Sequence, residues 1–256
     1  MLVTTLGRSA AIAAVALALS APALAAQKET ETVNKTVALP AHGTLKLRNF
    51  SGHVNLTPAP GNDVVIKAVR TAEREQLDHI KLEIETTGST VSIDANKRDA
   101  GWNERDHKDN VVRTDFDIQV PASAMLDVYG FSSDLDIRGI AGDQKLETFS
   151  GDITLDGAKG SVEAKTFSGR IDINLTGAGV APALSAETFS ADIRVRLADN
   201  AKGEVSFDSF SGRFDSDLPL TVRSIGRHRT SGDLPGGSSG STLHFHTFSG
   251  DVRVTK

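Results

Sequence analysis

Apolar and polar residues alternate in short runs along most of the chain after residue 120. In each repeat every second residue is apolar in a short segment before a break in the pattern, and again in a short segment after it. Examples are Val162 and Ala164 before the break and Ile171 and Ile173 after it. A period of two with one apolar face is typical of strands that bury one side. Gly- and Asp-containing connections such as residues 156–160 predict turns. The pattern predicts pairs of short strands, and no helical periodicity follows residue 85.

The break inside each strand pair carries a recurring motif of the form Phe-Ser-Gly-Asp-Ile. Its copies begin at Phe131, Phe149, Phe167, Phe189, Phe210 and Phe248, with a degenerate copy at Thr230 and an outlying one at Phe50. From Phe131 on, the spacings are 18, 18, 22, 21, 20 and 18 residues, and seven of the 11 Phe residues occupy this one position. Such regularity predicts a repeat architecture.

Two architectures fit these repeats, a meander of hairpins and a solenoid in which equivalent residues stack about 4.8 Å apart. Stacked in sequence order, Arg170 lies between two aspartates and Asp192 between two arginines. Arg194 likewise lies between Asp172 and Asp215. Because neighbouring opposite charges stabilise a ladder of strands, the charges favour the solenoid.

The chain before the regular repeats also reads as strands. Strands are expected at residues 33–39, 45–56, 64–69, 80–85, 91–94 and 115–120, with one helical turn at 72–78 and a polar loop at 97–110. We expect residues 26–120 to form a strand-rich lead-in of the same domain. Residues 121–256 then form the solenoid, with repeats of about 18–22 residues.

The first 25 residues have the pattern of a signal peptide. Arg8 precedes an apolar run at residues 10–19, Pro22 ends that run, and Ala23-Leu24-Ala25 offers small residues for cleavage near Ala25. An N-terminal membrane anchor is the alternative. No later apolar stretch is long enough to span a bilayer, so no transmembrane segment is expected after cleavage. The predicted location is the periplasm or the cell exterior.

Composition removes several classes of function. The 256 residues include no Cys, which excludes disulfides, Cys-ligated metals and thiol nucleophiles. A formal net charge of −5 argues against nucleic acid as a partner. No sequence motif for a cofactor is present, and none is predicted.

Four segments in order carry a family resemblance: residues 47–54 (LRNFSGHV), 64–68 (VVIKA), 116–121 (FDIQVP) and the Ser-Gly-Asp-Ile repeats. Over roughly residues 30–256 the chain resembles the bacterial putative-adhesin family, exported β-strand-repeat proteins with a domain of unknown function. The resemblance implies an all-β, right-handed β-helix or solenoid-like fold and an envelope location, with no established activity. This sequence departs from the family in placing Phe before almost every Ser-Gly.

The direction of the Phe column bears on function. If Val162, Ala164 and Thr166 point inward, strict alternation turns Lys165 and Phe167 outward. The column is then either an exposed binding stripe or a structural ladder that is buried or mutually stacked. The candidate binding residues are Phe131, Phe149, Phe167, Phe189, Phe210 and Phe248. An envelope glycan or another surface protein is the expected partner.

A second candidate site is a metal site. In sequence-order stacking His228 lies on His246, with Asp208 one coil further and His244 on the same strand face as His246. These four residues form a candidate zinc or nickel site. The alternative is a polar outer column that continues Glu147, Lys165 and Glu187 in the earlier repeats.

The sequence favours an exported envelope protein with an adhesin-like surface-binding or structural role and no catalytic activity. One alternative is a scaffold that assembles by pairing the open edges of its end coils. The charged segment 252–256 would then protect the last edge against such pairing. Another is a polysaccharide-acting β-helix enzyme, which needs carboxylates converging in a cleft. Residues 236–240 match G-x-S-x-G but lack the strand-to-helix turn of a nucleophile elbow.

Overall fold

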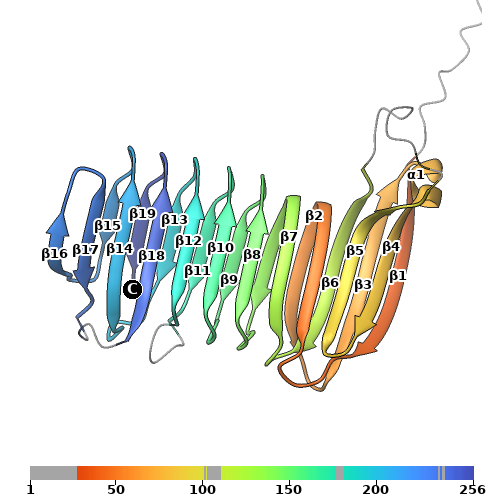
Figure 1. Ribbon diagram of the computed structural model, residues 1–256, viewed down its shortest axis with the longest axis horizontal. Coiled ribbons are helices and arrows are strands. Elements are labelled where there is room, and N and C mark those ends of the chain that lie inside the picture. Colours follow the sequence, from red (N-terminus) through yellow and green to blue (C-terminus); the bar gives the residue numbers. More distant parts are fainter. Residues whose placement is uncertain (1–27, 101, 103–110, 177–181, 236, 238–239) are drawn as a thin grey trace, which may run out of the picture.

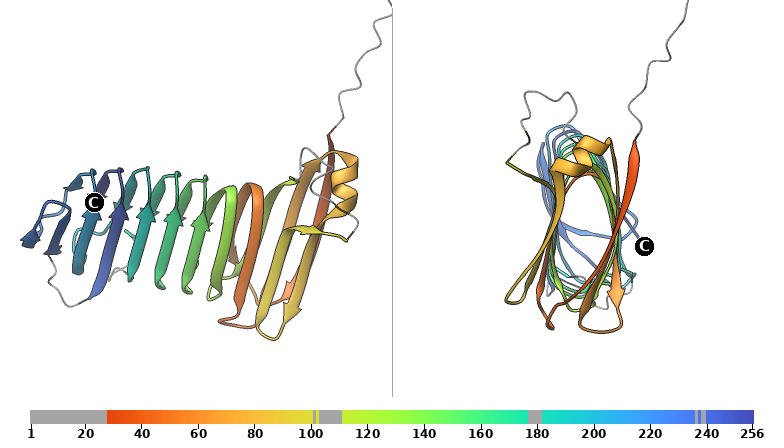
Figure 2. Two further views of the ribbon diagram at one scale, coloured as in Figure 1. Left: turned by 45° about the horizontal axis from the view of Figure 1, so that its top comes forward. Right: turned by 90° about the vertical axis from the view of Figure 1, so that its right-hand side faces the viewer.

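The computed structural model describes residues 28–100, 102, 111–176, 182–235, 237 and 240–256. They form a flattened solenoid whose strands lie across its long axis (Figure 1). Seen along that axis, the coils form a narrow oval with strands on both long sides (Figure 2). The long strands β2 (Thr44–Ala59) and β7 (Met125–Arg138) take part in both sides, which we call the first and second half-sheets. The predicted all-β solenoid-like fold is confirmed.

Hydrogen-bonded neighbours define the order of strands in each half-sheet. The first contains β4 (Ile80–Thr87), β5 (Thr90–Arg98), the start of β2, the start of β7, β8 (Gln144–Thr148), β10 (Val162–Thr166), β12 (Leu184–Thr188), β18 (Ser241–Thr247), β14 (Gly203–Ser209), β17 (Arg229–Asp233) and β16 (Thr221–Ile225). The second contains β1 (Glu29–Ala38), β3 (Asp63–Ala72), β6 (Arg113–Pro121), the end of β2, the end of β7, β9 (Ile153–Asp156), β11 (Ile171–Asn174), β13 (Ile193–Arg196), β19 (Val252–Thr255) and β15 (Phe214–Ser216).

Alternation along each strand builds one continuous core between the half-sheets. In the coil of β10 and β11, Val162, Ala164, Ile171 and Ile173 are at most 3% exposed and belong to the same apolar cluster. Burying a side chain of this kind stabilises the fold by roughly 1.5–3 kcal/mol, and each coil repeats the arrangement. The two strands meet at a tight corner at Gly169, where an added Cβ would lie 1.7 Å from the Gly151 carbonyl oxygen of the preceding coil. Close stacking of the corners therefore accounts for the Gly in the repeat.

The order of coils in space differs from their order in the sequence. The C-terminal strand β18 pairs with β12 on one side and with β14 on the other, both in parallel. In the second half-sheet β19 lies in the same way between β13 and β15. The chain thus passes from β13 to β14 and leaves a gap of one coil between them. It then forms the hairpin of β16 and β17, and its last residues, in β18 and β19, occupy the gap (Figure 1).

This insertion corrects two predictions from sequence-order stacking. Asp192 adjoins Asp251 instead of Arg213, and Arg194 lies between Asp172 and Arg253. The expected place of Arg170 between two aspartates is confirmed.

Two further corrections concern the end of the chain. The degenerate copy at residues 230–234 contributes to strand β17, which runs antiparallel to β14 and so is not a regular coil. The terminal segment 252–256 does not protect an exposed edge of the sheet, because β19 is an interior strand.

The predicted N-terminal strands are confirmed as β1 to β6, and the helical turn as α1 (Arg74–His79). The outlying copy at Phe50 is part of β2, which stacks directly on β7. The predicted signal peptide (residues 1–25) and most of the polar segment 97–110 lie outside the described residues. Within the part of the chain that the structure describes, no helix is long and apolar enough to cross a membrane.

Candidate binding surface

Aromatic side chains form a single stack along one margin of the first half-sheet. We call this stack the Phe ladder; in spatial order it contains Phe50, Phe131, Phe149, Phe167, Phe189, Phe248, Phe210 and His228. From Phe131 to Phe210 successive ring centroids are 4.7–5.1 Å apart, with interplanar angles of 3–5°. His228 ends the stack at 5.5 Å from Phe210. The inserted coil contributes Phe248 without interrupting the ladder.

Strand geometry causes the stacking. Parallel strands repeat every ~4.7–4.9 Å, a spacing within the range that offset-stacked aromatic rings prefer. A buried threonine precedes Phe149, Phe167, Phe189 and Phe248, and the buried Ser209 precedes Phe210. Thr166 Oγ1 donates to the Gly151 carbonyl at 3.2 Å and accepts the Gly169 N–H at 3.0 Å. The corner hydrogen bonds and the strand spacing therefore place the rings in register.

The ladder is stacked and exposed at the same time. Phe149, Phe167, Phe189 and Phe248 are each 42–45% exposed, and Phe210 is 64% exposed. The parity argument from the sequence was thus correct in turning Phe outward and Thr inward. Stacking and exposure, which the sequence left as alternatives, occur together, because each of these five rings has a ring neighbour on both faces and an edge toward solvent. Binding by this surface stays a prediction.

A row of charged residues runs beside the ladder, next to the buried threonines and Ser209 along the strands. We call it the charged row; in spatial order it contains Glu147, Lys165, Glu187, His246, Asp208 and Arg229. Lys165 Nζ lies 3.4 Å from Glu187 Oε2, and Arg229 Nε lies 3.4 Å from Asp208 Oδ1. A hydrogen bond to Glu163 raises the pKa of Lys165. Acidic residues thus alternate with Lys, His and Arg along the row.

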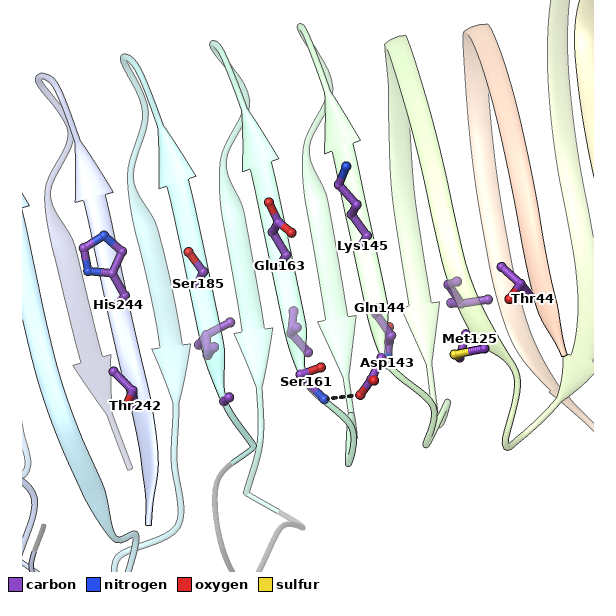
Figure 3. Close-up of a pocket in the computed structure, with 14 residues that line it drawn as sticks. Thr44, Met125, Asp143, Gln144, Lys145, Ser161, Glu163, Ser185, Thr242 and His244 are labelled. Atoms are coloured by element: carbon purple, nitrogen blue, oxygen red, sulfur yellow. Dashed lines mark hydrogen bonds between the residues drawn. The ribbon is translucent and has the colours of Figure 1, made fainter. Parts of the chain in front are cut away.

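Two open grooves follow the long axis on this half-sheet. One lies between the Phe ladder and the charged row, with Phe167, Phe189 and Lys165 among its lining residues. The other crosses the strands further from the ladder (Figure 3). Its lining includes Lys145, Glu163, Ser185 and His244. These residues begin what we call the outer row, which continues along the sheet with Ser206 and Ser231. Ser161 N–H donates to Asp143 Oδ1 at 2.9 Å in this second groove, and hydrogen bonding by Ser161 lowers the pKa of Asp143.

The four residues of the candidate metal site do not form one cluster. Asp208 lies beside His246 in the sheet and its Oδ2 is 4.0 Å from His244 Nδ1, but His228 stands apart. His246 faces Glu187 on one side and Asp208 on the other, and His228 does not stack on it. His228 Nδ1 instead lies 3.1 Å from the carbonyl oxygens of Ser209 and Phe210. The described residues include no group of three or more His, Cys, Asp or Glu side chains placed to share a metal ion. Because β18 is inserted on the far side of β14, β14 lies between His246 and His228, and the residues beside His246 continue the polar column of Glu147, Lys165 and Glu187.

The aspartates of the repeat hold neighbouring coils together. Asp134 Oδ1 accepts the Asp152 N–H at 3.0 Å, and Asp152 Oδ1 accepts the Arg170 N–H at 2.7 Å. Asp251 continues the pattern with Asp192 on one side and Arg213 on the other. These carboxylates bind backbone groups and do not converge in a cleft. Most of the G-x-S-x-G match at residues 236–240 lies outside the described residues.

Sequence reasoning missed the spatial order of the charged row and the place of His228 at the end of the ladder. The alternation along the earlier coils was visible as Glu147, Lys165 and Glu187. No signal in the sequence indicated that His246 and then Asp208 would follow Glu187.

Comparisons with known proteins give one family match and several remote structural matches. A family model described as Toastrack DUF4097 matches residues 36–255. A crystal structure of a putative cell adhesion protein from Clostridium sporogenes ATCC 15579 is 11% identical, with a TM-score of 0.47, over 89% of this chain and 99% of that one. A putative adhesin from Bacteroides fragilis NCTC 9343 is 6% identical, with a TM-score of 0.32, over 88% and 97% of the two chains. No curated protein matches the sequence.

Proposed function

The chain belongs to the Toastrack DUF4097 family, and on this premise we propose that it is an exported, non-catalytic protein of the cell envelope that makes adhesin-like contacts through the Phe ladder. The observation that carries the proposal is the exposure of the ladder, at 42–64% for five consecutive rings from Phe149 to Phe210 in spatial order. Exposed apolar residues in a continuous stripe mark interaction surfaces. The aspartate column has a structural role, which supports the absence of catalysis.

The exposed part of the ladder favours a protein partner over a glycan. A sugar ring packs on the face of an aromatic side chain, whereas both faces of Phe167 are covered by Phe149 and Phe189. The edges that remain suit apolar side chains of another protein, which gain by removing this surface from water. Lys165 and Glu187 beside the ladder supply polar contacts at the rim of such an interface.

The test uses a substitution that keeps the stack and changes only its edge. In the double variant Phe167→Tyr with Phe189→Tyr the rings still stack, while two hydroxyl groups enter the contact surface. Unpaired polar groups in an interface weaken binding, here by about 10- to 100-fold. The measurement is binding of the fluorescently labelled, exported chain to cells of its own species, together with the melting temperature.

The control is Arg194→Ser with Arg196→Ser, which changes two exposed residues on the second half-sheet. It should bind as the unchanged chain does. Equal binding by the tyrosine variant and the unchanged chain would refute the role of the ladder. Inhibition by soluble peptidoglycan fragments would instead identify a glycan as the partner.

A further inference from the structure

The charged row has a symmetry that the sequence order hides. In space its charges read acidic, basic, acidic, His, acidic, basic from Glu147 to Arg229. When a second copy faces the first with its long axis reversed, each residue meets the one at the same distance from the other end. Lys165 then faces Asp208, and Glu147 faces Arg229. At the centre Glu187 faces His246, so all pairs combine an acidic residue with Lys, Arg or His.

The other two rows of the surface accept the same superposition. A two-fold axis along the strand direction lays ladder on ladder, with Phe189 facing Phe248 and Phe167 facing Phe210. In the outer row Ser185 of one copy faces His244 of the other; within each copy the two residues lie on adjacent strands (Figure 3). Glu163 and Lys145 face serines of the partner copy. No pair of like charges arises within the three rows.

Shifting one copy along the long axis of the other changes which charged residues face each other. Sliding one copy by one coil places Glu147 opposite Asp208 in one direction and Lys165 opposite Arg229 in the other. Sliding by two coils toward the N-terminal end places Arg48, which pairs with Tyr129 in the sheet, opposite Arg229. Like charges at close range suppress a wrong register. A slide by two coils toward the C-terminal end creates no like pair, but it keeps only Glu187 opposite Arg229 and His246 opposite Asp208. The register with Glu187 and His246 at the centre therefore forms the most complementary pairs.

From this complementarity we propose that the Phe ladder and the charged row form a homotypic interface in which two copies of the chain associate face to face and antiparallel. The inference rests on the proposed function and names the protein partner of the same surface as a second copy. The apolar edges supply the contact, and the charges supply orientation, because exposed ion pairs contribute little affinity. A narrow stripe of this kind is suited to weak, reversible association, which cell-to-cell contact multiplies through many copies.

The experiment reverses charges in two separate variants and then mixes them. In Lys165→Glu, residue 165 of each copy faces Asp208 of the other with like charge, and in Asp208→Lys each copy places residue 208 against Lys165. Two symmetry-related pairs change from attraction to repulsion, so each variant alone should self-associate about tenfold more weakly than the unchanged chain. In a 1:1 mixture every pair is again of opposite sign, and association should return to that of the unchanged chain.

Sedimentation velocity at low ionic strength measures the association constants of the unchanged chain, of each variant and of the mixture. Mixing does not alter contacts within a chain, so recovery in the mixture does not come from folding. If Lys165→Glu or Asp208→Lys fails to fold, Glu147→Lys and Arg229→Glu provide the same test at the neighbouring pair. An unchanged chain that remains monomeric at high concentration, or a mixture no stronger than its components, would overturn the proposal.

Cells that lack the gene separate this inference from the proposed function. Loss of ladder-dependent binding on those cells identifies the second copy as the partner. Ladder-dependent binding that persists supports the proposed function with a different protein partner and overturns the homotypic interface.

Discussion

Replacement of Phe245 by alanine tests the insertion of the C-terminal coil. Phe245 lies on β18 with Ala186 of β12 on one side and Phe207 of β14 on the other, and it is 0% exposed. Truncating a fully buried Phe costs about 3–5 kcal/mol through lost burial and the cavity left behind. Since domains are stable by only about 5–15 kcal/mol, we expect a large loss of stability.

The matched control is Phe214→Ala on β15, which pairs with β19 and is partly buried. Because Phe214 is only half-buried in the last coil of its half-sheet, we expect its truncation to cost about 1–2 kcal/mol. Stacking in sequence order gives the opposite ranking, since Phe245 would lie in the terminal coil and Phe214 in an interior one. The comparison therefore measures where the last coil sits.

Urea unfolding followed by far-ultraviolet circular dichroism gives both free energies, provided that the slope with denaturant is unchanged. We expect Phe245→Ala to lower the free energy of unfolding by at least twice as much as Phe214→Ala. A smaller effect for Phe245→Ala than for Phe214→Ala would refute the placement of β18 and β19 between coils that precede them in the sequence.

Two further predictions concern the corner and the second groove. Gly169→Ala should destabilise the fold by several kcal/mol in thermal unfolding, because the new Cβ would lie 1.7 Å from the Gly151 carbonyl oxygen. Gly61→Ala, with no atom within 4 Å of the added Cβ, should change stability by less than about 0.5 kcal/mol, and equal effects would contradict the corner argument. The pKa of Asp143 is lowered from 3.8 by hydrogen bonds from Ser161, so its contribution to stability is present above about pH 4 and lost as pH falls through the lower pKa of the folded state. Asp143→Asn should therefore be less stable than the unchanged chain at neutral pH and converge with it at acidic pH; parallel stability curves would exclude this linkage.

Strand parity allowed much of the surface to be predicted from particular residues. The alternation at Val162, Ala164 and Thr166 implied that Lys165 and Phe167 point outward, and both do. The exposed ladder therefore followed from local sequence. Its stacking followed once equivalent residues were placed on parallel strands, since the strand spacing matches the spacing of aromatic rings.

The neighbours of the last coil could not be predicted in the same way. Most repeats have the same Phe-Ser-Gly corner and an inward apolar pair, so these local residues do not single out one coil as the neighbour of another. The candidate metal site failed for this reason, because His228 and His246 were placed on adjacent coils when β14 lies between them. Local residues encode the shape of a coil but not its position in the stack.

The sequence by itself therefore determined the coil: its two strands, its corner, its buried threonine and its outward Phe, since these depend on parity and on backbone geometry within about 20 residues. Only the tertiary structure decided the order of the coils, and with it the alternation of the charged row. That order depends on which edges are free when the C-terminal residues pack, and on the hairpin of β16 and β17 that diverts the chain before its return. The surface that we propose as an interface thus combines the Phe ladder, which follows from the repeated sequence motif, with the charged row, whose order results from the insertion of the C-terminal coil.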